Sequence, residues 1–197
     1  MILYCATTNP GKLREFRRAS RSGWEIEPAP DIEDIPAPEE TGATFADNAI
    51  LKARYYSHHA GEVPLFAEDS GIEVDALDGA PGVHSARFAG PKANDSENNL
   101  LLLERLKGKA DRRARYVSVV ALILPGQQPR IFRGTVEGEI LERPRGSGGF
   151  GYDPLFYYRP FQATFAEVTP EQKWSVSHRG VAVEAMMEFL GDGAEFV

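Results

Sequence analysis

The chain has 197 residues, and 22 Lys and Arg against 29 Asp and Glu give a formal net charge of −7 at pH 7. With 42% hydrophobic and 26% charged residues, this is an ordinary globular composition, which excludes a disordered or fibrous chain. The longest apolar stretches, such as residues 117–124, are too short to span a membrane, and the single cysteine, Cys5, excludes an intrachain disulfide framework.

Hydrophobic patterns and turn residues predict alternating strands and helices in the first half of the chain. Asn9 followed by Pro10 is typical of a helix start, because Asn can cap a helix and Pro fits its first turn. The alternation indicates α/β units. In order, we expect a strand at 2–6, a helix from about 12, a strand at 24–27, a Pro- and acid-rich loop at 28–43, a helix at 44–60, and a strand at 63–67 that ends at 68–71.

The second half introduces a hairpin, because Pro and Gly at 125–129 separate two strand-like segments. We therefore predict one α/β domain over residues 1–197, with a long mixed β-sheet, helices on its faces, and two lobes around a cleft. The expected elements are a helix at 100–106, strands at 114–124 and 130–141, a glycine cluster at 146–154, a strand at 155–158, and a helix at 170–190.

The first segment that could carry chemistry is the turn Thr7-Thr8-Asn9-Pro10-Gly11-Lys12. A turn between a strand and a helix can offer backbone N–H groups and a positive dipole end to an anion, and its lysine would add a charge. The Walker A spacing is absent. Taken alone, the hexapeptide favours a capped turn with a solvated lysine.

Two acidic segments form the second candidate. Glu39 and Glu40 lie in the predicted loop, and Glu68 with Asp69 follows a predicted buried strand. Carboxylates at strand ends could bind Mg²⁺, which prefers oxygen ligands and is often completed by substrate phosphates. The alternative is a solvated acidic loop and a capping aspartate. That alternative is weaker for Asp69, because the apolar run before it should bring it to the edge of the core.

The glycine cluster is the third candidate. Glycines around Phe150 would allow a flat ligand to approach the backbone of Gly151, and Phe150 or Tyr152 could stack on a base. Asp153 could accept a hydrogen bond from a ring N–H. A glycine-rich loop with a core aromatic is the alternative.

The fourth candidate lies in the predicted last helix. Lys173, His178 and Arg179 are hydrogen-bond donors suited to carbonyl oxygens or phosphates. Arg179 is one helical turn after Ser175, so the two would share a face. Taken alone, these residues favour a solvated helix face.

Together these segments resemble the inosine triphosphate pyrophosphatase family, the non-canonical purine nucleoside triphosphate pyrophosphatases. The matching pieces occur in family order over nearly the whole chain. They are T-x-N-x-x-K at 7–12, E-x-x-G at 39–42, N-A-x-x-K-A at 48–53, E-D-S-G at 68–71, G-A-P-G-V-H-S-A-R-F at 79–88, G-G-F-G-Y-D-P at 148–154 and K-x-x-x-S-H-R at 173–179.

The resemblance implies hydrolysis of ITP, dITP and XTP to the monophosphate and pyrophosphate, with Mg²⁺, in a homodimer. It implies that Glu39 and Asp69 bind the metal and that Asp69 accepts a proton from the attacking water. It further implies that Ser70 touches the substrate and that Phe150 stacks on the base. Residues 7–12 and Lys52 would hold the phosphates, and Asp153, Lys173, His178 and Arg179 would surround the base edge.

Specificity for a purine with a 6-keto group fits this set, because Arg179 can only donate hydrogen bonds and adenine carries an amino group there. A related pyrophosphatase of the Maf type, acting on other nucleoside triphosphates, is the closest alternative. A nucleotide-binding regulator without turnover is another, although a binder has no need of a water-activating Asp69. The net charge disfavours nucleic acid as a partner. With no signal peptide pattern and no membrane span, we expect a cytoplasmic enzyme.

Overall fold

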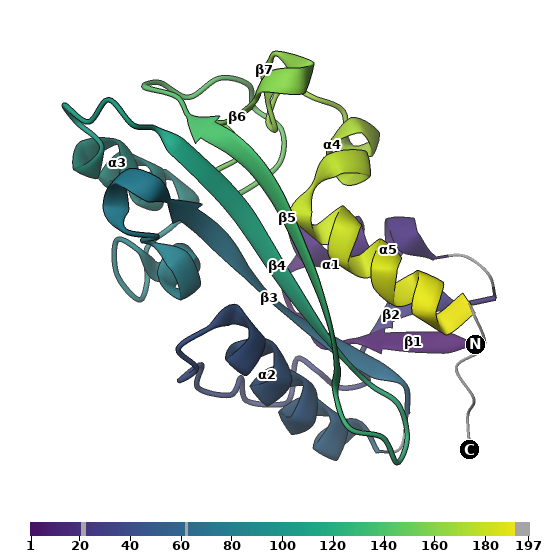
Figure 1. Ribbon diagram of the computed structural model, residues 1–197. Helices are drawn as coiled ribbons and strands as arrows, with labels where there is room; N and C mark the ends of the chain where they lie inside the picture. The colour runs from purple at the N-terminus through teal and green to yellow at the C-terminus, as the bar shows by residue number, and fades with distance from the viewer. Residues whose placement is uncertain (21–22, 62, 192–197) are drawn as a thin grey trace. The chain divides into compact units, whose positions relative to one another are not determined.

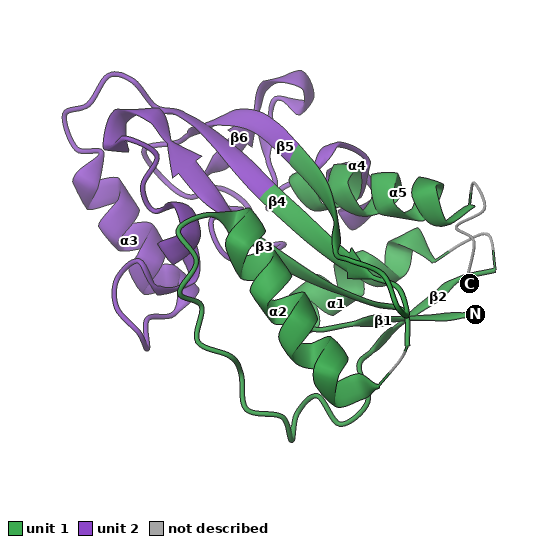
Figure 2. Ribbon diagram, turned by 60° about the horizontal axis from the view of Figure 1, so that its bottom comes forward, with its two compact units in different colours: residues 1–69, 118–134, 178–197 green, residues 70–117, 135–177 purple. Residues whose placement is uncertain are grey.

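The computed structural model describes residues 1–20, 23–61 and 63–191 (Figure 1). The chain forms two compact units, each assembled from several segments (Figure 2). Unit 1 consists of residues 1–69, 118–134 and the chain from 178 onward, and unit 2 consists of residues 70–117 and 135–177. Each unit carries part of the predicted functional set, so the two are described separately.

A seven-stranded sheet runs through the described residues in the order β2-β1-β3-β4-β5-β6-β7. β1 pairs in parallel with β2 and β3, whereas β5 with β6 and β6 with β7 are antiparallel, so the predicted mixed sheet is confirmed. The strands are β1 (Ile2–Cys5), β2 (Glu25–Pro28), β3 (Leu65–Val74), β4 (Arg113–Ile123), β5 (Arg130–Ile140), β6 (Phe156–Tyr158) and β7 (Ala163–Thr164).

Unit 1 places helices on both faces of its strands. α2 (Phe45–Ala60) covers one face, and α1 (Pro10–Phe16) and α5 (His178–Gly191) lie together against the other (Figures 1 and 2). The ring of Phe16 packs edge-on against Phe66 of β3, with centroids 5.2 Å apart. Thr44 caps α2 with a capping box, so the helix predicted at 44–60 begins one residue later.

Unit 2 has its own apolar core, in which β3, β4 and β5 contribute alternate side chains and α3 (Asp95–Arg105) contributes Leu102. The rings of Tyr116, Phe156 and Phe165 pack together within it, with centroids 4.6–6.1 Å apart. α4 (Pro170–Val176) begins with the capping box of Thr169. The unit also contains the 3₁₀ turns Asp75–Leu77, Gly82–Arg87 and Arg159–Phe161, and unit 1 contains the 3₁₀ turn Arg17–Ala19.

Two predicted boundaries are wrong. β3 does not end at Glu68 but continues to Val74, because its buried charges find partners within the fold and the apolar pattern resumes at Ile72. The expected helix at 170–190 is two helices, α4 and α5, because Ser177 has an extended backbone with ψ of 157°. The prediction that Ser175 and Arg179 share a helical face is therefore wrong, and Lys173 and Arg179 belong to different units.

The short β7 was not predicted, since two residues carry no periodicity. Within the described part of the chain, no helix is long and apolar enough to cross a membrane.

Candidate functional site

The turn at 7–12 is held by its own side chains. Asn9 caps α1, and its Oδ1 accepts hydrogen bonds from the backbone N of Gly11 (2.8 Å) and of Lys12 (3.1 Å). Thr7 Oγ1 accepts from the backbone N of Asn9 at 3.2 Å. The two backbone N–H groups that the sequence predicts as available to an anion are therefore already hydrogen-bonded to Asn9.

The neighbouring carboxylates Glu68 and Asp69 point to opposite faces of the sheet. Successive side chains of a strand alternate between faces, and both residues lie in the middle of β3. Glu68 meets α1 and α5, whereas Asp69 meets α2. Both are buried, at 5% and 6% exposure. Glu68 and Asp69, which are adjacent in the sequence, therefore belong to two sites with different surroundings.

On the α1 and α5 side, Glu68 joins three elements. Its Oε1 accepts hydrogen bonds from Ser118 Oγ (2.8 Å) and Arg179 Nε (3.1 Å), and its Oε2 lies 2.7 Å from Lys12 Nζ. Arg179 also contacts Glu15 Oε2 at 3.0 Å. Glu68 thereby connects the lysine of the 7–12 turn to the start of α5 within unit 1.

On the α2 side, Asp69 is surrounded by donors. Its Oδ1 lies 2.7 Å from Lys52 Nζ, and its Oδ2 accepts from Asn48 Nδ2 at 3.2 Å. Lys52 Nζ also donates to Glu40 Oε1 at 2.9 Å. Burial raises the pKa of Asp69 although the Lys52 cation opposes the shift. For Lys52, burial alone would lower the pKa, but Asp69 and Glu40 outweigh it and raise the pKa.

The carboxylates suit a hard cation only in part. Glu39 is exposed, and it is its neighbour Glu40 that shares Lys52 with Asp69. Over residues 1–20, 23–61 and 63–191, no group of three or more His, Cys, Asp or Glu side chains is placed to hold a metal ion. The carboxylates of Asp69 and Glu40 supply the oxygen ligands that Mg²⁺ prefers, although both are paired with Lys52 here, and substrate phosphates would complete the coordination.

Unit 2 contains the glycine loop, residues 148–154, and Asp153 of this loop forms hydrogen bonds both within the loop and to α4. Asp153 is 2% exposed, and its Oδ2 accepts from Lys173 Nζ (2.6 Å) and from the backbone N of Phe150 (2.9 Å). Lys173 Nζ lies 4.8 Å from the centre of the Phe150 ring. Three predicted base-site residues are therefore brought together. Tyr152 belongs instead to the core, where its hydroxyl donates to the backbone O of Ser85 at 2.8 Å.

The remaining predicted site residues are His178 and Arg179, which lie in α5, and Ser70, which lies in β3. His178 and Arg179 are the first two residues of α5 and are buried at 1% and 6% exposure. Arg179 is bonded to the Glu68 cluster of unit 1, while Lys173 is bonded to Asp153 of unit 2. Ser70 follows Asp69 in β3 and is half-buried.

Among the residues that contact these side chains, Glu15, Ser118 and Asn48 were not predicted as site residues, whereas Glu40 was already a candidate carboxylate. Glu15 resembles any solvated acid in a sequence, and Ser118 lies in an apolar strand without a signal. Asn48 did have one, since it is fully buried at 0% exposure and opens the N-A-x-x-K-A motif at 48–53. A buried amide in a helix needs a polar partner, and here the partner is Asp69.

With this fold and this distribution of side chains, the chain belongs to the Ham1 family, whose model matches residues 3–189. It is 47% identical to a dITP/XTP pyrophosphatase of Acidobacterium capsulatum, over 96% of this chain and 98% of the relative. It is 48% identical to a dITP/XTP pyrophosphatase of Thermus thermophilus, over 98% and 93%. A solved HAM1 protein from Coxiella burnetii superposes with a TM-score of 0.89 at 39% identity, covering 98% of this chain and all of that one. The family resemblance seen in the motifs is confirmed.

Proposed function

We propose that the protein hydrolyses non-canonical purine nucleoside triphosphates, namely ITP, dITP and XTP, to the monophosphate and pyrophosphate, and so removes them from the nucleotide pool. The observation that carries this proposal is the near full-length identity of 47–48% to dITP/XTP pyrophosphatases. At that identity the same reaction is the simplest inference, and the purine enzyme is favoured over a Maf-type pyrophosphatase and over a regulator without turnover.

The cations of unit 1 are assigned to the triphosphate. Lys12 and Lys52 are the lysines predicted to hold the phosphates, and carboxylates hold both ammonium groups in fixed positions. Fixed charges stabilise a transition state without first reorganising. The turn at 7–12, which presents Lys12, supports the same role.

Mg²⁺ is the proposed metal, held by Asp69 with a carboxylate of the 39–40 loop. When bound, it would neutralise phosphate charge and polarise the bond that breaks. Asp69 is the proposed proton acceptor for the water that attacks the α-phosphorus, and its hydrogen bonds to Lys52 and Asn48 hold the carboxylate in a fixed orientation for this role.

The base is assigned to Phe150, Asp153 and Lys173 in unit 2, and the family resemblance is the ground for adding His178 and Arg179. Phe150 would stack on the purine, Asp153 would accept from a ring N–H, and the donors would recognise the 6-keto oxygen. An amino group at that position leaves buried donors without acceptors, which costs about 1–3 kcal/mol for each donor.

The decisive experiment is pyrophosphate release with Mg²⁺ from ITP, dITP, XTP, GTP, ATP and dTTP. We expect the first three to be preferred by at least an order of magnitude in kcat/KM. Equal rates on ATP and ITP, or orthophosphate as the product, would refute the proposal. Fastest turnover of dTTP would favour the Maf alternative.

Two variants test which loop carboxylate serves the metal. Glu39 is exposed and Glu40 is bonded to Lys52, so Glu39→Gln and Glu40→Gln form a matched pair. The variant that raises the Mg²⁺ concentration needed for half-maximal rate identifies the ligand. If neither variant does so, the loop has no part in metal binding.

The family resemblance also supports a cytoplasmic homodimer with a single 197-residue domain. Light scattering coupled to gel filtration measures the mass directly, and a monomer at micromolar concentration would refute the dimer.

A further inference from the structure

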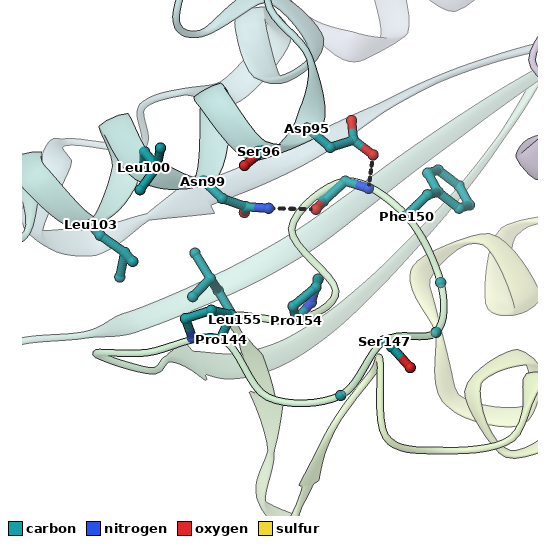
Figure 3. A pocket seen from close by; sticks show the side chains of 14 residues that line it. Asp95, Ser96, Asn99, Leu100, Leu103, Pro144, Ser147, Phe150, Pro154 and Leu155 are labelled. Atoms are coloured by element: carbon teal, nitrogen blue, oxygen red, sulfur yellow. Dashed lines mark hydrogen bonds between the residues drawn. The ribbon is translucent and has the colours of Figure 1, made fainter.

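The N-terminal part of α3 is hydrogen-bonded to the backbone of the glycine loop at one residue, Gly151. Asp95 Oδ2 accepts a hydrogen bond from the backbone N of Gly151 at 2.6 Å, and Asn99 Nδ2 donates to the backbone O of Gly151 at 2.9 Å. Figure 3 shows both side chains reaching from the helix to this part of the loop. Donor and acceptor of a single residue are thus both bound by side chains of one helix.

The spacing explains why one helix can make both bonds. Asp95 and Asn99 are four residues apart, so they lie on the same face of α3. The helix is itself fixed, because Asn94 forms a capping box and Asn98, 3% exposed, bonds the backbone N of Ala89 (2.8 Å) and O of Ala86 (3.1 Å). The two side chains that bind Gly151 are therefore mounted on a rigid element.

The loop needs such support, because its backbone is unusual on both sides of Phe150. Gly149 has φ of +70° and Gly151 has φ of +62°, a region that favours glycine but that glycine readily leaves. Asp153 binds the backbone N of Phe150, which fixes the inner side of the loop. Asp95 and Asn99 fix the next residue from the outside, so Phe150 lies between two anchored peptides.

A cavity of about 400 Å³ lies beside these hydrogen bonds and is lined by both α3 and the loop (Figure 3). Space next to the loop means that packing alone does not hold it in place on this side. On this side of the loop, the hydrogen bonds of Asp95 and Asn99 to Gly151 therefore hold the backbone in place. The bond to Asp95 is charge-assisted, and such bonds are roughly twice as strong as neutral ones.

We propose that Asp95 and Asn99 are positioning residues that set the affinity of the enzyme for the base by fixing the peptide on which Phe150 is mounted. The inference rests on the proposed function, in which Phe150 stacks on the purine. A mobile loop loses conformational entropy when a ligand orders it, which weakens binding. If the stacking ring is already held in place before the base binds, this loss does not occur. The two residues act on KM and on base preference, and neither touches the reacting phosphorus.

Amide hydrogen exchange of residues 148–153, with no nucleotide present, tests the hydrogen bonds to Gly151 themselves. We expect faster exchange in Asp95→Ala and Asn99→Ala than in the wild type. Ser96→Ala is the matched control, because Ser96 is exposed, neighbours Asp95 and lines the same cavity. Exchange in the two variants that equals that of the control would overturn the proposal.

Steady-state kinetics test what these hydrogen bonds do. Asp95→Ala and Asn99→Ala should raise KM for dITP by about tenfold, the change that 1.4 kcal/mol produces, with kcat within about twofold of the wild type. Asp95→Asn keeps an acceptor for the Gly151 N–H and should recover most of the loss. A fall in kcat at unchanged KM would overturn the proposal, as would failure of Asp95→Asn to differ from Asp95→Ala. Absence of wild-type turnover on any purine triphosphate would instead refute the proposed function, and the exchange comparison would still decide whether α3 holds the loop.

Discussion

Glu68 offers the sharpest test of how unit 1 is held together. Glu68→Gln preserves the shape of the side chain and an acceptor for Ser118, but it removes the charge that faces Lys12 and Arg179. Removing one partner of a buried ion pair typically costs about 3–5 kcal/mol. Arg179 retains Glu15, and the Lys12 side chain is 18% exposed, so water offsets part of the loss. We expect the free energy of unfolding to fall by about 2–3 kcal/mol.

Urea unfolding and thermal melting measure this change. The urea midpoint should fall at constant m-value, and for a chain of this size the melting temperature should fall by roughly 5–10 °C. Asp111→Asn is the control, because the Asp111–Arg113 pair is equally short at 2.7 Å but its side chains are 40% and 69% exposed. That variant should stay within about 0.5 kcal/mol of the wild type. If Glu68→Gln costs no more than Asp111→Asn, burial does not determine the strength of these pairs and the reasoning is wrong.

Two further substitutions test packing and pH dependence. Gly134→Ala should lower the free energy of unfolding by more than about 3 kcal/mol, because the added carbon would overlap the backbone oxygen of His178, and calorimetry that finds unchanged stability would contradict the close approach of β5 to α5. The pKa of Glu167 lies below its ordinary 4.5, because it accepts from the backbone of Thr164 and from Arg145. Its contribution is therefore present above pH 4.5 and is lost as the pH falls through the lowered pKa of the folded state. The urea midpoints of wild type and Glu167→Gln should differ at pH 7 and converge as the pH falls below 4.5, while a constant gap would refute the assignment.

Local patterns in the sequence predicted most of the fold. The caps Asn9 and Thr44 lie where the sequence predicts helix starts, because a capping side chain bonds amides only two or three residues away. The strand-like segments around the hairpin at 125–129 also have nearly the expected bounds.

Long-range partners explain what the sequence could not reveal. In the sequence, Glu68 and Asp69 predict the end of the strand, because charged residues are seldom buried. It continues because Arg179, 111 residues away, and Lys52 neutralise these charges within the fold. Similarly, no glycine or proline at Ser177 marks the end of α4, and the break follows from tertiary packing.

The strand alternation that separates Glu68 from Asp69 also predicts opposite effects on stability. Glu68 is stabilised by its partners, so removing its charge destabilises the fold. The pKa of Asp69 is raised by burial, which means that its ionised form is less favourable in the folded than in the unfolded chain. At neutral pH this carboxylate therefore costs stability, and Asp69→Asn, in which Lys52 keeps Glu40, should melt at or above the wild-type temperature.

The same variant should lose most pyrophosphate release, because the proposed proton acceptor is gone, while dITP binding remains measurable by calorimetry. Stability given up at a catalytic carboxylate is a recurrent feature of enzymes. Asp69→Asn that is both active and stable would remove the proposed role of Asp69. A large loss of stability would mean that Asp69, like Glu68, is held mainly as a structural ion pair, and two adjacent residues on opposite faces of one strand would then serve the same purpose.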